Sequence, residues 1–160
     1  MGKNLIAYFS ASGVTARIAR RLQEAVGGDL YEIRPAVPYT SADLDWRSNE
    51  SRSSVEMRDP LCRPAMADTD APVTGADTVY IGFPVWWYRE PSIIDSFLTA
   101  YDFSGKTVIP FATSGASEIG AEAPKRMQEE APQAKVLEGR RFSADASADE
   151  LKTWADSLSL

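Results

Sequence analysis

The segment from Asn4 to Ala19, NLIAYFSASGVTARIA, constrains the fold of this chain more than any other. Its apolar run, Leu5 to Phe9, ends abruptly at a loop of small polar residues. A short and nearly unbroken apolar run is typical of a strand that is covered on both faces in a parallel sheet. Apolar residues recur at helical spacing after the loop, from Ile18 to Val26. The segment therefore predicts a strand, a loop and a helix in succession.

The loop itself has the composition of a phosphate-binding loop. Ser10, Ser12 and Thr15 supply three hydroxyls, and Gly13 supplies a permissive backbone position at the start of the helix. The first N–H groups of a helix lack intrahelical partners and lie at the positive end of its dipole, so they bind an anion without Lys or Arg. The alternative interpretation is that Ser12 only caps the helix.

Two better-known phosphate loops are absent. The loop of ATP-binding proteins needs G-x-x-x-x-G-K-[ST], and the dinucleotide fingerprint needs G-x-G-x-x-G. Neither pattern occurs between Phe9 and Ala19. A single glycine flanked by hydroxyls instead indicates one terminal phosphate.

The length of the chain indicates how many domains it forms, and its net charge indicates which kinds of partner it can bind. A chain of 160 residues predicts a single domain, residues 1–160. Its 17 basic and 23 acidic residues give a net charge of −6, which disfavours nucleic acid and anionic membranes and suits a basic protein partner. The chain has no leader pattern and no apolar run of membrane-spanning length. We therefore expect a cytoplasmic protein.

The chain has no histidine and a single cysteine, Cys62. These counts exclude an internal disulfide, a cysteine-ligated iron–sulfur cluster, a Ser–His triad and the usual histidine-containing zinc and haem sites. We expect Cys62 to be inert and predict no metal site and no catalytic side chain. Redox chemistry in this chain would therefore need a bound cofactor.

The remaining pattern alternates strands with helices. We predict further strands at residues 30–34, 78–83, 106–112 and, more weakly, 136–142, with helices following Pro91, spanning 118–130 and following a capping box at Ser147 and Glu150. The secondary structure of residues 37–77 is the hardest to predict from the sequence. A weakly amphipathic helix is expected around 41–56. The alternation predicts an α/β fold with a doubly wound, five-stranded parallel sheet.

Three unusual loops follow the first, third and fourth of these strands, at residues 10–15, 84–88 and 113–117. The carboxyl ends of parallel strands meet at one edge, where doubly wound sheets bind their ligands. The consecutive aromatic residues Trp86, Trp87 and Tyr88 cannot all point into the core, so at least one faces a crevice. Together the loops predict a site for a flat heterocycle with one phosphate. Trp46 either covers this ligand or, as we favour, packs in a partly buried position.

The motifs YFSxSGxT, PxWW and TSGxS, in this order along the chain, resemble those of flavodoxins of the short-chain type. The resemblance covers essentially the whole chain. It implies a three-layer α/β/α fold with strand order 2-1-3-4-5 and an FMN cofactor. The sequence departs from the family pattern at Val14, where Asn is usual, at Tyr88, where Gly is frequent, and at Ala116, where a second Gly is common.

The resemblance also implies which residues contact FMN. The first loop would hold the phosphate, the second would line the isoalloxazine ring, and the third would complete the pocket around the ring. The residues are Ser10, Ala11, Ser12, Gly13, Val14 and Thr15 in the first loop, Pro84, Val85, Trp86, Trp87 and Tyr88 in the second, and Thr113, Ser114, Gly115, Ala116 and Ser117 in the third.

The resemblance implies a flavoprotein that acts as a low-potential electron carrier between redox partner proteins, a reductase and an acceptor. The alternative is an FMN-dependent NAD(P)H:quinone-type oxidoreductase. In this oxidoreductase, Arg89 would be the candidate contact for the phosphate of the nucleotide. The interpretation that we favour is that Arg89 is a solvent-exposed charge on the loop. A third hypothesis is that the chain is an interaction protein that binds no cofactor. A receiver domain of the same fold class is disfavoured, because Phe9 to Gly13 contain no acidic residue.

Overall fold

The computed structural model describes residues 3–114 and 118–158. The strands are β1 (Asn4–Tyr8), β2 (Asp29–Glu32), β3 (Thr78–Pro84), β4 (Thr107–Thr113), β5 (Lys135–Val136) and β6 (Arg140–Phe142). The helices are α1 (Val14–Val26), α2 (Arg52–Arg58), α3 (Ser92–Ala100), α4 (Glu122–Glu130) and α5 (Ala148–Ser157). All paired strands are parallel, in the order β2-β1-β3-β4-β5, so the predicted doubly wound fold is confirmed.

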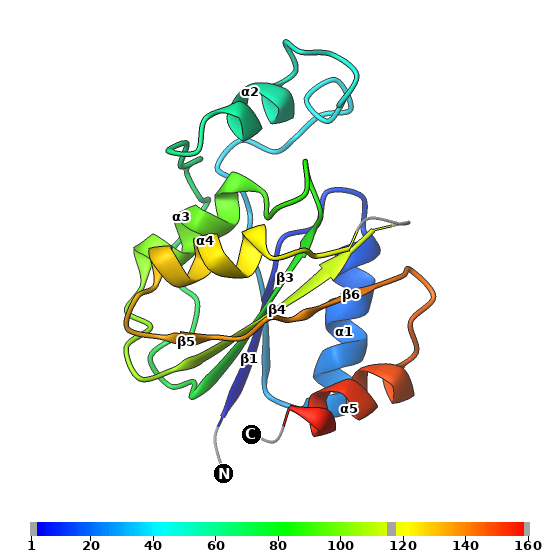
Figure 1. Cartoon of the computed structure of the whole chain (residues 1–160), viewed down its shortest axis with the longest axis vertical. Helices are drawn as coiled ribbons and strands as arrows, with labels where there is room; N and C mark the ends of the chain where they lie inside the picture. The colour runs from blue at the N-terminus through cyan, green and yellow to red at the C-terminus, as the bar shows by residue number, and fades with distance from the viewer. Residues whose placement is uncertain (1–2, 115–117, 159–160) are drawn as a thin grey trace.

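Helices cover both faces of the sheet (Figure 1). On one face α1 and α5 pack together, and Ile18 and Leu22 are fully buried against that side of the sheet. On the other face α3 and α4 pack together, with Phe97 fully buried among the sheet's apolar side chains. The apolar runs predicted as strands are therefore buried on both sides, as a parallel sheet requires.

The two best-marked helix ends lie where the sequence predicts them. Helix α1 ends at Val26, and Gly27 follows with a φ of 76°, a conformation that favours glycine. Helix α5 begins after Ser147, whose Oγ accepts a hydrogen bond from the Glu150 N–H at 3.1 Å. The Glu150 carboxylate accepts a hydrogen bond from Arg140 at 3.1 Å, so this side chain also ties α5 to β6.

The predicted fifth strand is interrupted, and Pro110 on β4 explains the interruption. The Leu137 N–H donates to Val108 O at 2.9 Å, so alternate residues of β4, including Pro110, face the fifth strand. Proline has no N–H to give to a neighbouring strand. Opposite it, Gly139 approaches so closely that a Cβ there would lie 2.2 Å from Pro110 O. The chain consequently pairs with β4 twice, as β5 and as β6, with a short break between.

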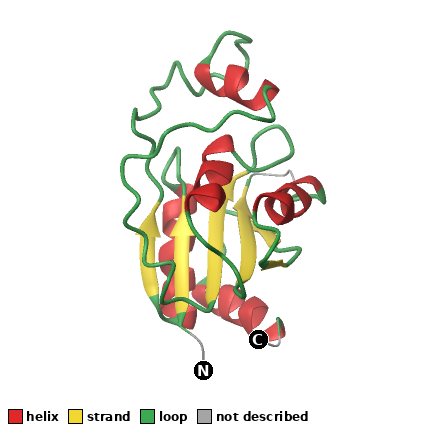
Figure 2. Ribbon diagram, turned by 90° about the vertical axis from the view of Figure 1, so that its left-hand side faces the viewer, coloured by secondary structure: helices red, strands yellow, loops and turns green. Residues whose placement is uncertain are grey.

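The expected helix at 41–56 is wrong for most of its length, since α2 spans only Arg52–Arg58. Before it, Thr40 and Asp43 exchange hydrogen bonds between side chain and backbone at 2.9 and 3.1 Å. Side chains of this kind compete with helical hydrogen bonding. The helix begins only at Ser51, whose Oγ accepts from the Ser54 N–H. Figure 2 shows α2 and its flanking loops beyond the carboxyl ends of the strands.

Within the described ranges 3–114 and 118–158, no helix combines the length and the apolar character that crossing a membrane requires.

Candidate functional site

The loops after β1, β3 and β4 meet at the carboxyl edge of the sheet. A hydrogen bond of 2.7 Å links the hydroxyl of Thr15, at the start of α1, to that of Thr113, at the end of β4. The Val85 N–H donates to Thr113 O at 3.1 Å, so the loop after β3 is fixed to the same point. The predicted convergence of these loops is therefore present in the described part of the chain.

Helix α1 has no side-chain cap, because Gly13 occupies the cap position with a φ of 93°. Only glycine adopts this left-handed conformation without strain. The Gly13 N–H donates to Ser10 Oγ at 3.0 Å, which closes the loop, while Ser12 is exposed. The interpretation of Ser12 as a helix cap is therefore wrong.

This helix start fits a phosphate. The first hydrogen bond within α1 runs from the Arg17 N–H to Gly13 O, so the preceding N–H groups of Val14, Thr15 and Ala16 have no partner in the helix. The first turn contains no acidic residue that would repel an anion. Thr15 is buried and its hydroxyl is hydrogen-bonded to that of Thr113, so this side chain holds the start of α1 against the end of β4. Ser12 is the exposed hydroxyl of the loop, and Ser10 is half-buried.

The loop after β3 is a tight two-residue turn. Trp86 and Arg89 exchange backbone hydrogen bonds at 3.0 and 3.1 Å, and Trp87 and Tyr88 between them have φ values of 47° and 67°. A turn with two positive φ values normally contains Asn and Gly. A left-handed conformation costs a residue with a Cβ about 1–2 kcal/mol. The turn therefore stores strain at the place where the resemblance puts the flavin ring.

The three consecutive aromatic side chains have different surroundings. Trp86 packs edge-on against Phe9 and Tyr39, with ring centroids 5.6 and 5.5 Å away. Trp87 is 43% exposed and Tyr88 is 77% exposed. The expectation that the three cannot all point inward is therefore met, and the strained turn presents two rings to the solvent.

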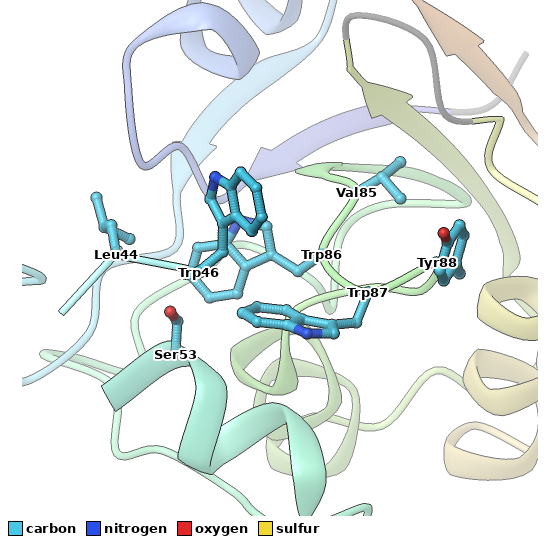
Figure 3. Close-up of a pocket in the computed structure, with 7 residues that line it drawn as sticks. All are labelled: Leu44, Trp46, Ser53, Val85, Trp86, Trp87 and Tyr88. Atoms are coloured by element: carbon cyan, nitrogen blue, oxygen red, sulfur yellow. The ribbon is translucent and has the colours of Figure 1, made fainter. Parts of the chain in front are cut away.

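Beyond the turn lies a cleft of about 530 Å³, which we call the aromatic cleft (Figure 3). It is lined by Leu44, Trp46, Ser53, Val85, Trp86, Trp87 and Tyr88. Trp46 is 70% exposed, so its interpretation as a packing residue is wrong. A second cavity, of about 390 Å³, borders Ser10 and Ala11 on the side of β2.

Arg89 is neither a solvated loop charge nor available to a nucleotide, because it is buried in a cluster of four charged side chains. It lies 3.5 Å from Asp95 Oδ2 and 3.8 Å from Glu90 Oε2. Arg126, on α4, donates to the same two oxygens, at 3.1 Å to Glu90 and 3.0 Å to Asp95. Both carboxyl groups are fully buried.

The Glu90 carboxyl group of this cluster holds its proton to a higher pH than an ordinary carboxyl group does, because its pKa is raised. Within the described residues, neither Glu90 Oε1 nor Asp95 Oδ1 has a hydrogen-bond partner, although both oxygens are buried. Burial and the neighbouring Asp95 raise the pKa of Glu90 to about 9. A protonated Glu90 can donate to Asp95, which gives both oxygens a partner.

Arg141 on β6 is a site residue that no sequence pattern revealed. Its guanidinium donates to Ser114 Oγ at 3.2 Å and to Ser114 O at 3.0 Å. It thereby fixes the chain just after β4. The predicted contacts Gly115, Ala116 and Ser117 lie outside the described residues. Among the residues that are described, no group of three or more acidic, cysteine or histidine side chains is arranged to hold a metal ion.

The fold and the site define a doubly wound protein in which an uncapped helix start and an aromatic turn lie at the same edge of the sheet. A family model described as flavodoxin matches residues 3–158, so the chain belongs to the flavodoxin family. The chain is a flavoprotein of this family by sequence and fold. No curated protein sequence matches it.

Two similar crystal structures come from Bacteroides species, and both proteins are described only as flavoprotein candidates. The protein from Bacteroides eggerthii is 46% identical, with a TM-score of 0.93 over 100% of this chain and 99% of its own. That from Bacteroides uniformis is 50% identical, with a TM-score of 0.91 over 97% and 98%. A flavoprotein from Lactobacillus acidophilus in complex with FMN is 20% identical, with a TM-score of 0.68 over 97% and 99%, and shares the fold.

Proposed function

We propose that this protein binds FMN and carries electrons at low potential between redox partner proteins. The observation that carries the proposal is the uncapped start of α1 at Gly13, which lies beside the aromatic turn at the same sheet edge. One element suits a phosphate and the other suits a flat ring. The FMN complex of the Lactobacillus acidophilus relative supports this choice of cofactor.

The chain's own groups have distinct tasks in this proposal. The N–H groups of the first turn of α1 bind the phosphate, assisted by the hydroxyls of Ser10 and Ser12. The residues from Pro84 to Tyr88 lie against the ring, and the loop after Thr113 completes the pocket. FMN supplies the redox chemistry when it is bound, and no side chain acts as an acid or a base.

The charge of the chain supports protein partners. Its net charge of −6 favours association with basic surfaces and opposes binding to polyanions. Negative surroundings also disfavour additional negative charge on a reduced flavin, which lowers its reduction potential. We propose a reductase and an acceptor protein, both with basic docking surfaces, as the partners.

A second candidate function is an FMN-dependent NAD(P)H:quinone-type oxidoreductase, and the aromatic cleft favours it. A cleft of about 530 Å³ beside the flavin loop has room for a small substrate. However, Arg89, the candidate contact for the nucleotide phosphate, is buried among Glu90, Asp95 and Arg126. This observation removes the one side chain that sequence had offered to a nicotinamide nucleotide.

Anaerobic reduction of the FMN-loaded protein separates the two functions. The absorbance of the flavin is followed first with NADH, then with NADPH, and finally with a photochemical reductant. For a carrier, we expect neither nucleotide to bleach the flavin within minutes, whereas light reduces it in two separate one-electron steps. Rapid bleaching by either nucleotide would refute the carrier function and support the oxidoreductase.

A further inference from the structure

The buried cluster of Arg89, Glu90, Asp95 and Arg126, which we call the charged cluster, adjoins the aromatic turn. Arg89 closes the turn through its backbone bonds to Trp86, and Glu90 follows it directly. We propose that the charged cluster positions the aromatic turn for the flavin ring, with Arg126 on α4 as a positioning residue that acts through Glu90. This inference rests on the proposed function and assigns a role at the same site to a residue outside the three loops.

The aromatic turn needs a restraint from its surroundings. Trp87 and Tyr88 have φ values of 47° and 67°, a conformation that is unfavourable for residues with a Cβ. Backbone strain of this kind persists only where the surrounding structure over-determines the conformation. The side chains of both residues are exposed, so they add little packing of their own. We therefore expect the restraint to come from the residues that follow the turn.

Arg89 supplies contacts of this kind to two helices. Its buried guanidinium donates to Met57 O on α2 and to Ser92 Oγ on α3, both at 3.3 Å. It also donates to Glu90 O at 2.9 Å and lies 3.5 Å from Asp95 Oδ2. A planar guanidinium with several acceptors has a narrowly defined position. The closing residue of the turn is thereby fixed relative to α2 and α3.

Arg126 connects the same residues to α4. Its guanidinium donates to Glu90 Oε2 at 3.1 Å, to Asp95 Oδ2 at 3.0 Å and to Pro60 O at 3.2 Å. One side chain of α4 thus contacts the residue after the turn, a residue of α3 and the loop after α2. If Arg126 were removed, the remaining cation of the cluster would be Arg89, at 3.8 Å from Glu90 Oε2 and 3.5 Å from Asp95 Oδ2. These distances are too long for strong hydrogen bonds.

Stability alone does not explain the charged cluster. The desolvation of buried charged groups can cost more than their mutual attraction returns, and apolar side chains of similar volume often stabilise a protein equally well. Glu90 and Asp95 are nevertheless fully buried. Directional hydrogen bonds between such groups define a single arrangement of the elements that carry them. The geometry that the cluster imposes on the turn is therefore its better explanation.

Amide hydrogen exchange in the flavin-free protein tests the positioning role without any flavin. The Arg89 N–H donates to Trp86 O at 3.1 Å, so its protection reports how often the turn opens. Arg126→Gln removes the charge, whereas Arg126→Lys keeps the charge and loses the planar fork that reaches both carboxyl groups. We expect the protection of the Arg89 N–H to fall about tenfold in Arg126→Gln and about threefold in Arg126→Lys, while the amides of α1 keep theirs.

Flavin binding then shows which end of the ligand depends on the cluster. If the turn has its binding conformation in only about a tenth of the Arg126→Gln molecules, FMN and riboflavin should both bind about tenfold more weakly. The ratio of the two affinities should stay unchanged, because the start of α1 is not altered. Arg126→Lys should recover part of both losses.

Arg21→Gln is the matched control. Arg21 is also half-buried, and its guanidinium donates to Ala146 O at 2.7 Å, which ties α1 to the segment before α5 on the other face of the sheet. Its loss removes an arginine contact of the same kind away from the turn. This variant should keep the protection of the Arg89 N–H and the affinity for both flavins.

Two results in either Arg126 variant would overturn the proposal: an unchanged protection of the Arg89 N–H, or equal losses of protection at the turn and in α1, which would indicate only a less stable protein. A loss of affinity for FMN alone would do so as well, since it would place the effect at the phosphate. If Arg126→Gln does not fold, Arg126→Lys decides by the same criteria. If the unsubstituted protein binds neither flavin, the FMN proposal fails, and amide exchange alone decides whether Arg126 positions the turn.

Discussion

The buried pair of Glu90 and Asp95 predicts how the stability of this protein depends on pH. In the folded protein Glu90 retains its proton up to a pKa of about 9, whereas in the unfolded chain it releases this proton near the ordinary value of 4.5. Between these values the folded state binds more protons than the unfolded state. The free energy of unfolding therefore falls as pH rises, by at most about 1.4 kcal/mol per pH unit for one proton.

Glu90→Gln removes this proton while it preserves the shape of the side chain and a donor toward Asp95. From pH 6 to pH 8, we expect the free energy of unfolding of the unsubstituted protein to fall by up to about 3 kcal/mol, and that of the variant to change much less. The chain has no histidine, the side chain that ordinarily titrates in this window. Chemical denaturation of the flavin-free protein at pH 6, 7 and 8 measures both slopes.

Glu24→Gln is the control, since Glu24 is exposed on α1 and the same charge is removed there. This control should keep the slope of the unsubstituted protein. Equal slopes for Glu90→Gln and the unsubstituted protein would refute the raised pKa of Glu90. A stability that increases from pH 6 to pH 8 in the unsubstituted protein would refute the direction of the pKa shift.

Three further substitutions test the geometry of the site and the sheet by thermal or chemical unfolding. Tyr88→Asn should stabilise the protein by about 1 kcal/mol, because Asn tolerates a positive φ, whereas Tyr88→Ala keeps the strain and should not. Gly82→Ala should destabilise it by about 1–3 kcal/mol, since the new Cβ would lie 2.2 Å from the Phe111 ring; a neutral effect would contradict this contact. Thr15→Val should cost about 1–3 kcal/mol by leaving the Thr113 hydroxyl buried without its partner, and Thr113→Val added to it should recover part of the loss.

The sheet and the helices packed on it follow from local patterns in the sequence. The apolar runs at Leu5 and Val79 are strands because only a parallel sheet with two covered faces buries such runs completely. Gly27 and Ser147 mark helix ends through their own backbone and side-chain chemistry. These features depend on residues close in sequence, which is why they are predictable.

Two of the features that were not predicted depend on contacts between different elements, and the third depends on local turns. Arg89 is buried because Asp95, on α3, and Arg126, on α4, complete its cluster. Trp46 is exposed because polar residues around it form local turns in place of the expected helix. The break in the fifth strand arises from Pro110 on the neighbouring strand. The sequence of a single segment therefore contains no signal for the Arg89 cluster or for the break in the strand.

The central claim is that the start of α1 holds the phosphate of FMN, and a comparison of FMN with riboflavin tests it most directly. Quenching of flavin fluorescence gives both dissociation constants for the unsubstituted protein and for Gly13→Ala, which strains the loop at its φ of 93°. Two charge-assisted hydrogen bonds to the phosphate predict FMN affinity at least about 100-fold above that of riboflavin, and Gly13→Ala should weaken FMN alone. Equal affinities for the two flavins, or equal losses in the variant, would contradict the account.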